Sequence, residues 1–399
     1  MSRRSYNDTR RFDADRTQVR RRPVAASPEP YAAPARERVV VRERVEKVKV
    51  KRVRAPRHGC LSLFLWIFAL CIAVLCAARM LPLDMSVGPL IPKAVSFVPW
   101  VIVPAIVILL LALLWARHVL IFFIGMFVAL LVWWHAGYFV PSGTLTEAGE
   151  GVGQASAFVG DNVVRVMTLN TLNGHADANE VVACVRQNNV EVLALQEVSW
   201  SFLEQLAAAG IYDVLPYHVE SEAGPWDNGG LNCLFSMTPM DNVNSNLLPM
   251  ELSAISAGTI EVGGRSLRLV SCHPSSPHLG GEGLWDEGLT TIGSLAGYAN
   301  CYVILGDFNA TWNHARFREL LGTTFVDASE QAGEGFHMTW PSESVTAGLR
   351  LPFVGSVPPL IEIDHIVYSA NSGVFVGDLK TVQIAGTDHL ALIGTLEVQ

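Results

Sequence analysis

Polar and ionisable residues recur at the ends of apolar, strand-like runs in the second half of this 399-residue chain. Each taken alone is typical of a turn, a helix cap or a solvated loop. Loops at strand ends also build functional sites above a sheet, so the whole set predicts a site. Its members are Asn170, Glu197, His273, Asp307, Asn309, Asp364, Asp388 and His389.

The residue types in this set indicate one chemistry. Carboxylates gathered after apolar strands, with no lysine nearby, are costly unless a positive charge compensates them. A hard divalent cation held by oxygen ligands is the simplest compensation. Carboxylates, amides and imidazoles together could then neutralise developing charge, accept a proton from water and hold phosphate oxygens. The sequence has no C-x-x-C pair, which argues against a cysteine-type zinc site.

The order and spacing of these residues resemble the endonuclease/exonuclease/phosphatase superfamily. The resemblance rests on L-Q-E ending at Glu197, G-D-F-N over 306–309, T-W-P over 339–341, I-D-H over 363–365 and T-D-H over 387–389. It covers about 240 residues and leaves the first 160 outside. It implies an α/β fold, a four-layer α/β/β/α sandwich, and a metal-dependent phosphoester hydrolase.

The resemblance also implies a metal site. Carried over residue by residue, it makes Glu197 a ligand of the cation with Asn170 beside it, and Asp388 completes the metal side. The expected cofactor is Mg²⁺ or Mn²⁺. Asn170 is also expected to contact the substrate.

The remaining roles concern the phosphate and the attacking water. By resemblance, Asp307 orients or deprotonates the water, and Asn309 binds the phosphate. His273 and His389 stabilise the phosphate or the leaving oxygen, while Asp364 orients an imidazole. The residue types agree with these roles but do not separate them.

Hydrophobic periodicity predicts the elements that position these residues. Strands that partly alternate with helices and partly form hairpins indicate layered sheets flanked by helices. The expected strands are 163–169, 190–195, 230–235, 259–262, 267–271, 302–305, 363–368 and 390–396, and the expected helices are 176–188, 200–209, 285–300 and 315–321. Cysteines within these strands favour buried thiols over disulfides.

The first part of the chain differs sharply in charge and hydropathy. Residues 1–59 hold 18 basic and 7 acidic residues, predicting a disordered basic tail. Three apolar runs follow, at about 61–78, 98–115 and 119–140, and predict transmembrane helices. Arg117 and His118 mark a turn between the last two. The positive-inside rule keeps the tail cytoplasmic, so three crossings of the cell membrane place a linker (141–157) and a catalytic domain (158–399) outside the cytoplasm.

The acidic charge of the C-terminal part disfavours one class of substrate but leaves several others open. Residues 144–399 hold 8 basic and 29 acidic residues, which argues against binding a polyanionic duplex. A lipid headgroup, a small phosphoester or a nucleic acid stays open as substrate, so an extracytoplasmic nuclease is the alternative function. A non-catalytic sensor or scaffold is a third hypothesis. The tail is either solvated or lies on anionic lipid of the bilayer. An apolar loop at 349–360 is either an edge of the sandwich or a rim of the site. No obligate protein partner is inferred.

Overall fold

The computed structural model describes residues 59–80, 88–155, 160–224, 228–278, 280–342, 350–351 and 355–399. By its contacts the chain divides into two units, and the second, Arg57–Gln399, contains every described residue. The predicted basic tail lies outside the described residues except for Gly59. Residues 349 and 352–354 of the apolar loop at 349–360 lie outside them too.

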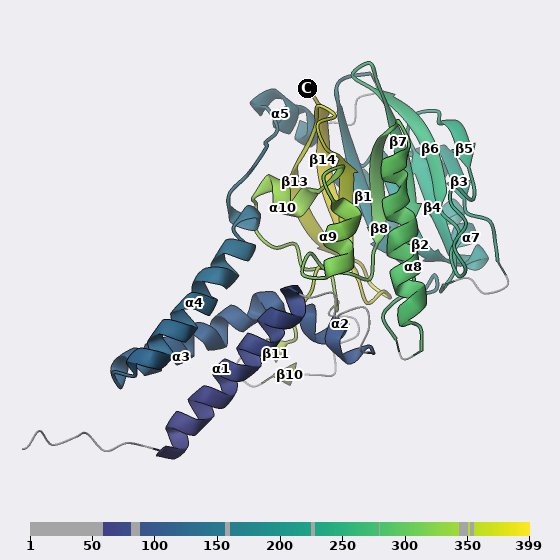
Figure 1. Cartoon of the computed structure of the whole chain (residues 1–399). Helices are drawn as coiled ribbons and strands as arrows, with labels where there is room; N and C mark the ends of the chain where they lie inside the picture. Colours follow the sequence, from purple (N-terminus) through teal and green to yellow (C-terminus); the bar gives the residue numbers. More distant parts are fainter. Residues whose placement is uncertain are drawn as a thin grey trace, which may run out of the picture. The chain divides into compact units, whose positions relative to one another are not determined.

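Two mixed six-stranded sheets form the centre of the fold (Figure 1). The first has the order β13-β14-β1-β2-β4-β3, and the second β5-β6-β7-β8-β12-β9. Within them only β1–β2 and β7–β8 pair in parallel. The strands of the first sheet are β1 (Val163–Asn170), β2 (Val192–Val198), β3 (Tyr217–Glu220), β4 (Leu231–Ser236), β13 (Val374–Gln383) and β14 (Leu390–Val398). Those of the second are β5 (Asp241–Asn244), β6 (Ser256–Val262), β7 (Arg265–Cys272), β8 (Cys301–Asp307), β9 (Phe325–Asp327) and β12 (Asp364–Ser369). A separate pair joins β10 (Arg350–Leu351) to β11 (Gly355–Ser356).

The sheets pack face to face because their strands are apolar on both sides. In β1, Val166 belongs to the cluster between the sheets, whereas Met167 belongs to the cluster under the helices. In β8, Leu305 faces the other sheet and Ile304 faces the helices. Strands buried on both faces read as continuous apolar runs, with alternation deciding which face each residue takes.

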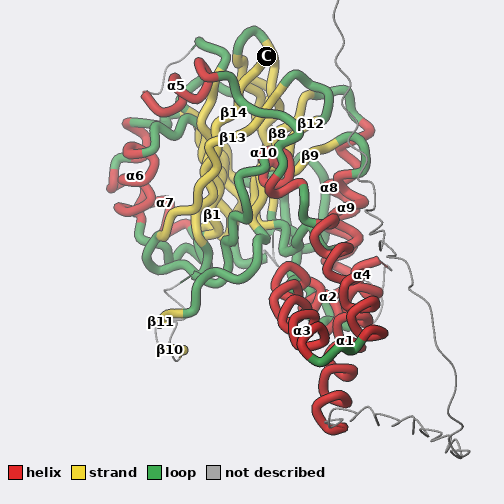
Figure 2. The backbone as a smooth tube through the Cα atoms, turned by 90° about the vertical axis from the view of Figure 1, so that its left-hand side faces the viewer, coloured by secondary structure: helices red, strands yellow, loops and turns green. Residues whose placement is uncertain are grey.

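Amphipathic helices cover the outer face of each sheet (Figure 2). Helices α6 (Ala178–Gln187) and α7 (Trp200–Ala209) pack on the first sheet, and α8 (Glu282–Gly293) and α9 (Ala315–Leu321) on the second. Asp177 caps α6 by accepting from the backbone N–H groups of Asn179 and Glu180. Two helix-flanked mixed sheets confirm the α/β sandwich expected from the sequence.

Several elements were not expected from the sequence. β13 is a ten-residue strand whose pattern is broken by a bulge between Gly377 and Lys380. The short strands β3, β5 and β9 and the helix α10 (Ala328–Ala332) have too few residues to show a period. The 141–157 segment, expected as a linker, contains α5 (Glu147–Ala155), and η3 (Gly137–Phe139) lies just before it. Glu397 accepts hydrogen bonds from the backbone and hydroxyl of Thr146, which holds α5 to the end of β14. All seven cysteines are free thiols.

Each apolar run near the N-terminus is helical. The helices are α1 (Gly59–Met80), η2 (Val98–Val101) continuing into α3 (Ile102–Leu114), and α4 (His118–Trp134). Only α1 is long and apolar enough to cross a membrane by length and composition; the other two are shorter apolar helices. Three spans are therefore not confirmed. A short helix, α2 (Leu90–Val95), which the sequence did not predict, precedes η2.

Candidate active site

The predicted site residues converge at one edge of the sandwich, in the space between the sheets. Asn170 and Asp307 end β1 and β8 in positions that face the opposite sheet, and Asp364 begins β12 directly beside Asp307 in the ladder. His273 follows β7 on the same face as Ser271, whose hydroxyl accepts a hydrogen bond from Gln196 across the sheets at 3.1 Å. Strand alternation thus directs all these side chains into one space.

Asn170 links two carboxylates across the two sheets. Its amide nitrogen donates to Glu197 Oε1 and to Asp307 Oδ2, each at 3.0 Å. Its amide oxygen accepts from the backbone N–H of Leu172 at 2.9 Å, which fixes the orientation of the amide. Glu197 Oε2 accepts from the backbone N–H of Asn173 at 2.9 Å. Asn170 therefore holds the two carboxylates near each other.

The backbone at Glu197 is bent to aim its side chain into this space. Glu197 has φ +55°, and the pairing of β2 with β4 shifts register between Leu195 and Val198. A non-glycine residue in this conformation is strained and is often found at functional sites. A Cβ at Gly229 would lie 2.5 Å from the Glu197 carboxyl carbon, so glycine leaves room for the carboxylate.

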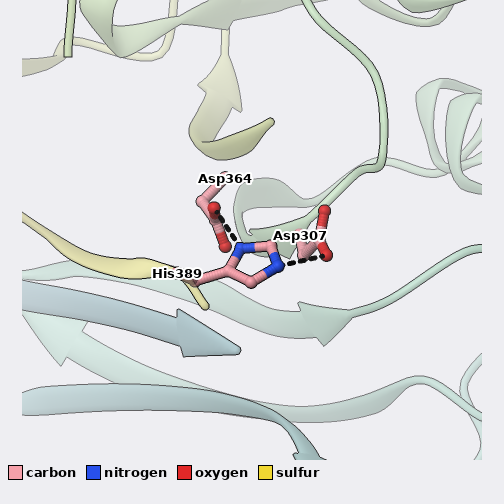
Figure 3. A group of neighbouring side chains, drawn as sticks. All are labelled: Asp307, Asp364 and His389. Atoms are coloured by element: carbon pink, nitrogen blue, oxygen red, sulfur yellow. Dashed lines mark hydrogen bonds and ion pairs between the residues drawn. The ribbon is translucent and has the colours of Figure 1, made fainter. Parts of the chain in front are cut away.

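His389 lies between two buried carboxylates (Figure 3). Its Nδ1 is 2.8 Å from Asp364 Oδ2, and its Nε2 is 3.6 Å from Asp307 Oδ2. Burial lowers the pKa of His389, but Asp364 and Asp307 outweigh it and raise that pKa to about 10. Burial alone would raise the pKa of Asp307, but His389 and His273 hold it at about 2. The imidazole is therefore a cation and Asp307 an anion at neutral pH.

His273 lies on the other side of Asp307. Its Nε2 is 3.4 Å from Asp307 Oδ2 and 3.7 Å from Glu197 Oε1. The Asn309 amide nitrogen lies 3.1 Å from His273 Nε2, and the Asn228 amide nitrogen 3.2 Å from its Nδ1. Burial opposes protonation of His273, but its hydrogen bond to Asp307 raises its pKa overall. The ring of His273 thus faces Asp307, as His389 does, and its pKa is raised by Asp307 and Glu197.

Of the predicted site residues, six line one cavity of about 490 Å³: Glu197, His273, Asp307, Asn309, Asp388 and His389. Asn228, Trp340 and Lys93 are among the lining side chains that the sequence analysis missed. Asn228 precedes a Gly-Gly pair, and Trp340 donates from Nε1 to Asp388 Oδ2 at 3.1 Å. Lys93 comes from α2, far from any motif. The T-W-P motif could have pointed to Trp340, but no sequence signal pointed to Lys93.

Neighbouring residues of the I-D-H motif face opposite ways. Asp364 faces the space between the sheets, where it contacts His389, whereas His365 packs on Phe317 under the helices, with ring centroids 4.4 Å apart. Its Nδ1 lies 3.3 Å from Asp327, and its Nε2 lies 2.9 Å from the Ala310 carbonyl. Burial opposes protonation of His365, but Asp327 raises its pKa to about 9. His365 therefore supports the fold beneath the site.

The donor set fits a hard cation. Ligand atoms of Asp307, Asp364 and His389 all lie within 4.8 Å of one another, but a protonated His389 has no free lone pair for a metal, so carboxylate oxygens are the candidate ligands. Asp364 Oδ1 and Asp388 Oδ1 are buried with no hydrogen-bond partner. Buried carboxylate oxygens without donors are costly, and a bound divalent ion is a common reason to keep them.

A family model described as the endonuclease/exonuclease/phosphatase family matches residues 167–389. The chain belongs to this family. The match begins within β1 and ends at His389, so it includes every predicted site residue and excludes the apolar helices. The membership makes the domain a phosphoester hydrolase.

Similar solved structures include several hydrolases. The chain matches Danio rerio TDP2 in complex with a single-strand DNA product at 15% identity, covering 59% of this chain and 100% of that one, with a TM-score of 0.47. It matches sphingomyelinase C of Streptomyces griseocarneus at 18% identity, covering 58% and 99%, with a TM-score of 0.41. A Bacteroides vulgatus family member matches at 15% identity, covering 59% and 99%, with a TM-score of 0.46. A search of curated proteins finds no match.

Proposed function

We propose that this chain is a membrane-anchored hydrolase that cleaves phosphoesters outside the cytoplasm with Mg²⁺ or Mn²⁺. The observation that carries the proposal is the junction of Glu197, Asn170 and Asp307, where the two sheets meet within 3.0 Å hydrogen bonds. Two carboxylates held this close in an enclosed space favour binding of a divalent cation.

Glu197 is the ligand we assign to the cation. Asp364 is a poor candidate, because its Oδ2 already accepts from His389 at 2.8 Å and an ion between them would break that hydrogen bond. Asp388 completes the metal side through its unpartnered Oδ1. Asn170 positions the carboxylates rather than coordinating, since its oxygen is held by Leu172. A bound cation would stabilise charge developing on the phosphate and lower the pKa of water.

The remaining side chains act on the phosphate and the water. His389, protonated and oriented by Asp364, stabilises negative charge on the phosphate oxygens. His273 and the amide of Asn309 bind the same group from the opposite side of Asp307. A carboxyl with a pKa of about 2 is a weak proton acceptor, so Asp307 chiefly orients the attacking water through a hydrogen bond.

Membrane anchoring rests on the apolar helices. α1 is long enough to span, and the outer faces of α1, α3 and α4 expose large apolar side chains such as Leu63, Val103 and Phe122. The end of α1 meets the end of α4 where Arg79 lies 4.1 Å from the Trp134 ring. Arg79 also donates to Asn313 at 2.8 Å, so both helices end on the catalytic domain. This agrees with three crossings that place the Arg117 turn and the basic tail in the cytoplasm.

A hydrolysis assay tests this function. The full chain, reconstituted in nanodiscs, is expected to cleave bis-p-nitrophenyl phosphate with Mg²⁺ or Mn²⁺ and to lose activity with EDTA. Glu197→Gln should lower kcat/KM about 100-fold or more, because the cation loses its anionic ligand. Glu204→Gln, an exposed change of the same kind on α7, is the control. Activity that survives both EDTA and Glu197→Gln contradicts the proposal.

A further inference from the structure

One wall of the active-site cavity comes from outside the family domain. Lys93, Ser96 and Phe97 line the cavity, although the family model covers only residues 167–389. Ser96 and Phe97 follow Lys93 by three and four positions, and the backbone from α2 to Ser96 is helical. Both residues therefore lie on the same helix face as Lys93. The segment between the first two apolar helices therefore closes the cavity.

A buried histidine attaches this segment to the catalytic domain. The backbone N–H of Thr311 donates to His314 Nδ1 at 2.8 Å, so that nitrogen carries no proton. His314 Nε2–H therefore donates to the carbonyl oxygen of Pro92 at 2.9 Å. Ser96 donates to the same carbonyl at 3.2 Å. His314 comes four residues after the G-D-F-N-A stretch (306–310), and its contact with Pro92 fixes the position of Lys93 next to the site.

A second attachment lies at η2. Trp100 Nε1 donates to the carbonyl oxygen of Leu360 at 2.6 Å. The Leu360 N–H donates to the Trp340 carbonyl at 2.7 Å, and Trp340 in turn contacts Asp388. The apolar segment is thus connected at both ends to residues that line the cavity.

The cavity divides into two chemical regions. Glu197, Asp307 and Asp388 make one side acidic, where the cation is proposed to bind. On the rim, Lys93 is the single lysine or arginine among the described lining residues, and its ammonium has no hydrogen-bond or ion-pair partner there. Phe97 lies on the same helix face and is 38% exposed. A rim with one free ammonium beside an aromatic ring suits an anionic group joined to an apolar one.

The apolar part of this rim continues into the apolar helices. Leu90 begins α2 with 79% of its surface exposed, and Val103 near the start of α3 is 56% exposed. Such exposed apolar residues, contiguous with helices proposed to enter a bilayer, place the cavity mouth at the lipid surface.

We propose, resting on the hydrolase function above, that the substrate is a lipid-borne phosphoester with an anionic headgroup. Lys93 pairs with the headgroup, and Phe97 contacts the apolar part of the lipid as it leaves the bilayer. Lys93 is then a specificity-determining residue outside the family domain. It favours anionic headgroups over zwitterionic ones that present their own cation.

The test compares three substrates with Mn²⁺ and the full chain reconstituted directly in vesicles, because the cavity mouth is proposed to open at the surface of the chain's own bilayer. The substrates are soluble bis-p-nitrophenyl phosphate, phosphatidylglycerol in vesicles that contain it, and phosphatidylcholine in vesicles of that lipid alone. Lys93→Gln is expected to lower kcat/KM for phosphatidylglycerol about 10- to 100-fold, the effect of losing a charge-assisted hydrogen bond. Hydrolysis of the soluble diester should change less than about 3-fold. Lys93→Arg should restore most of the loss, and Lys380→Gln, on β13 outside the cavity, is the matched control.

The outcomes separate the two proposals. No hydrolysis of any substrate by the unmodified chain overturns the proposed function and this inference with it. Hydrolysis of the soluble diester with no preference for phosphatidylglycerol, or an equal loss on all three substrates in Lys93→Gln, overturns the inference alone. Preference for a single-stranded oligonucleotide over every vesicle also overturns it.

Discussion

Replacing Asp364 by asparagine tests whether His389 needs the negative charge of its partner or only the hydrogen bond. Asp364 is fully buried, and its Oδ2 accepts from His389 Nδ1 at 2.8 Å. Asparagine has nearly the same volume and can still accept that hydrogen bond through its amide oxygen. The change therefore removes a negative charge while leaving the orientation of the ring largely intact.

The magnitude follows from the pKa of His389. That pKa is about 10 against an ordinary value of 6.5, and Asp364 is the largest of the groups that raise it. If Asp364 supplies about half of this rise in pKa, His389 of the variant loses its proton at about pH 8. We expect kcat at pH 7 to fall about 100-fold or more, since the ring loses its partner's charge in the transition state.

Two measurements check this prediction. The pH profile of kcat should gain a decline on the alkaline side, and a metal-free NMR titration should show His389 deprotonating at lower pH than in the unmodified protein. Asp241→Asn, an exposed change on β5, should alter neither quantity. An Asp364→Asn protein that folds but keeps the ordinary kcat and His389 titration would refute the assigned role.

Two further predictions concern the surroundings of the site. Gly229→Ala should lower kcat/KM about 10-fold or more, because the added Cβ would lie 2.5 Å from the Glu197 carboxyl carbon. Gly264→Ala is the control, since Gly264 has a similar positive φ but open space around it. That change should lower stability without lowering activity. The pKa of His365 is raised from 6.5 to about 9 by Asp327, so its contribution to stability is complete below pH 6.5 and is lost as pH rises through 9. Thermal unfolding measured across this pH range should show the loss, of about 3 kcal/mol at most. His365→Gln should remove this pH dependence. A variant whose stability depends on pH as that of the unmodified protein does would count against the role of the His365–Asp327 pair.

Much of the site was predictable because strand alternation and chain order are both visible in the sequence. Leu269 and Leu305 are apolar residues that face the other sheet, and His273 and Asp307 follow them at even spacing. The same parity places Asp364 beside Asp307 in the space between the sheets and turns His365 away from it. Asp364 and His365 therefore face the site and the core respectively, because successive side chains of a strand point to opposite faces of the sheet.

Other features of the site and the fold depend on tertiary contacts, which cannot be inferred from the local sequence pattern. Lys93 reaches the cavity because His314, more than 200 positions later, holds the helix that carries it. Asn228 becomes part of the site only through the packing of its loop on His273. β13 was missed because the bulge at Asp378 interrupts its alternation. Tertiary contacts set these positions, so sequence periodicity could not.

The central claim is that Glu197 holds a divalent ion beside Asn170 and Asp307, in position for phosphoester cleavage. Anomalous diffraction from crystals of the full chain grown with Mn²⁺ tests it most directly. We predict a manganese peak in the cavity within coordination distance of Glu197, and loss of that peak in Glu197→Gln. A fully active protein whose manganese lies elsewhere, or binds equally well without the Glu197 carboxylate, would contradict the claim.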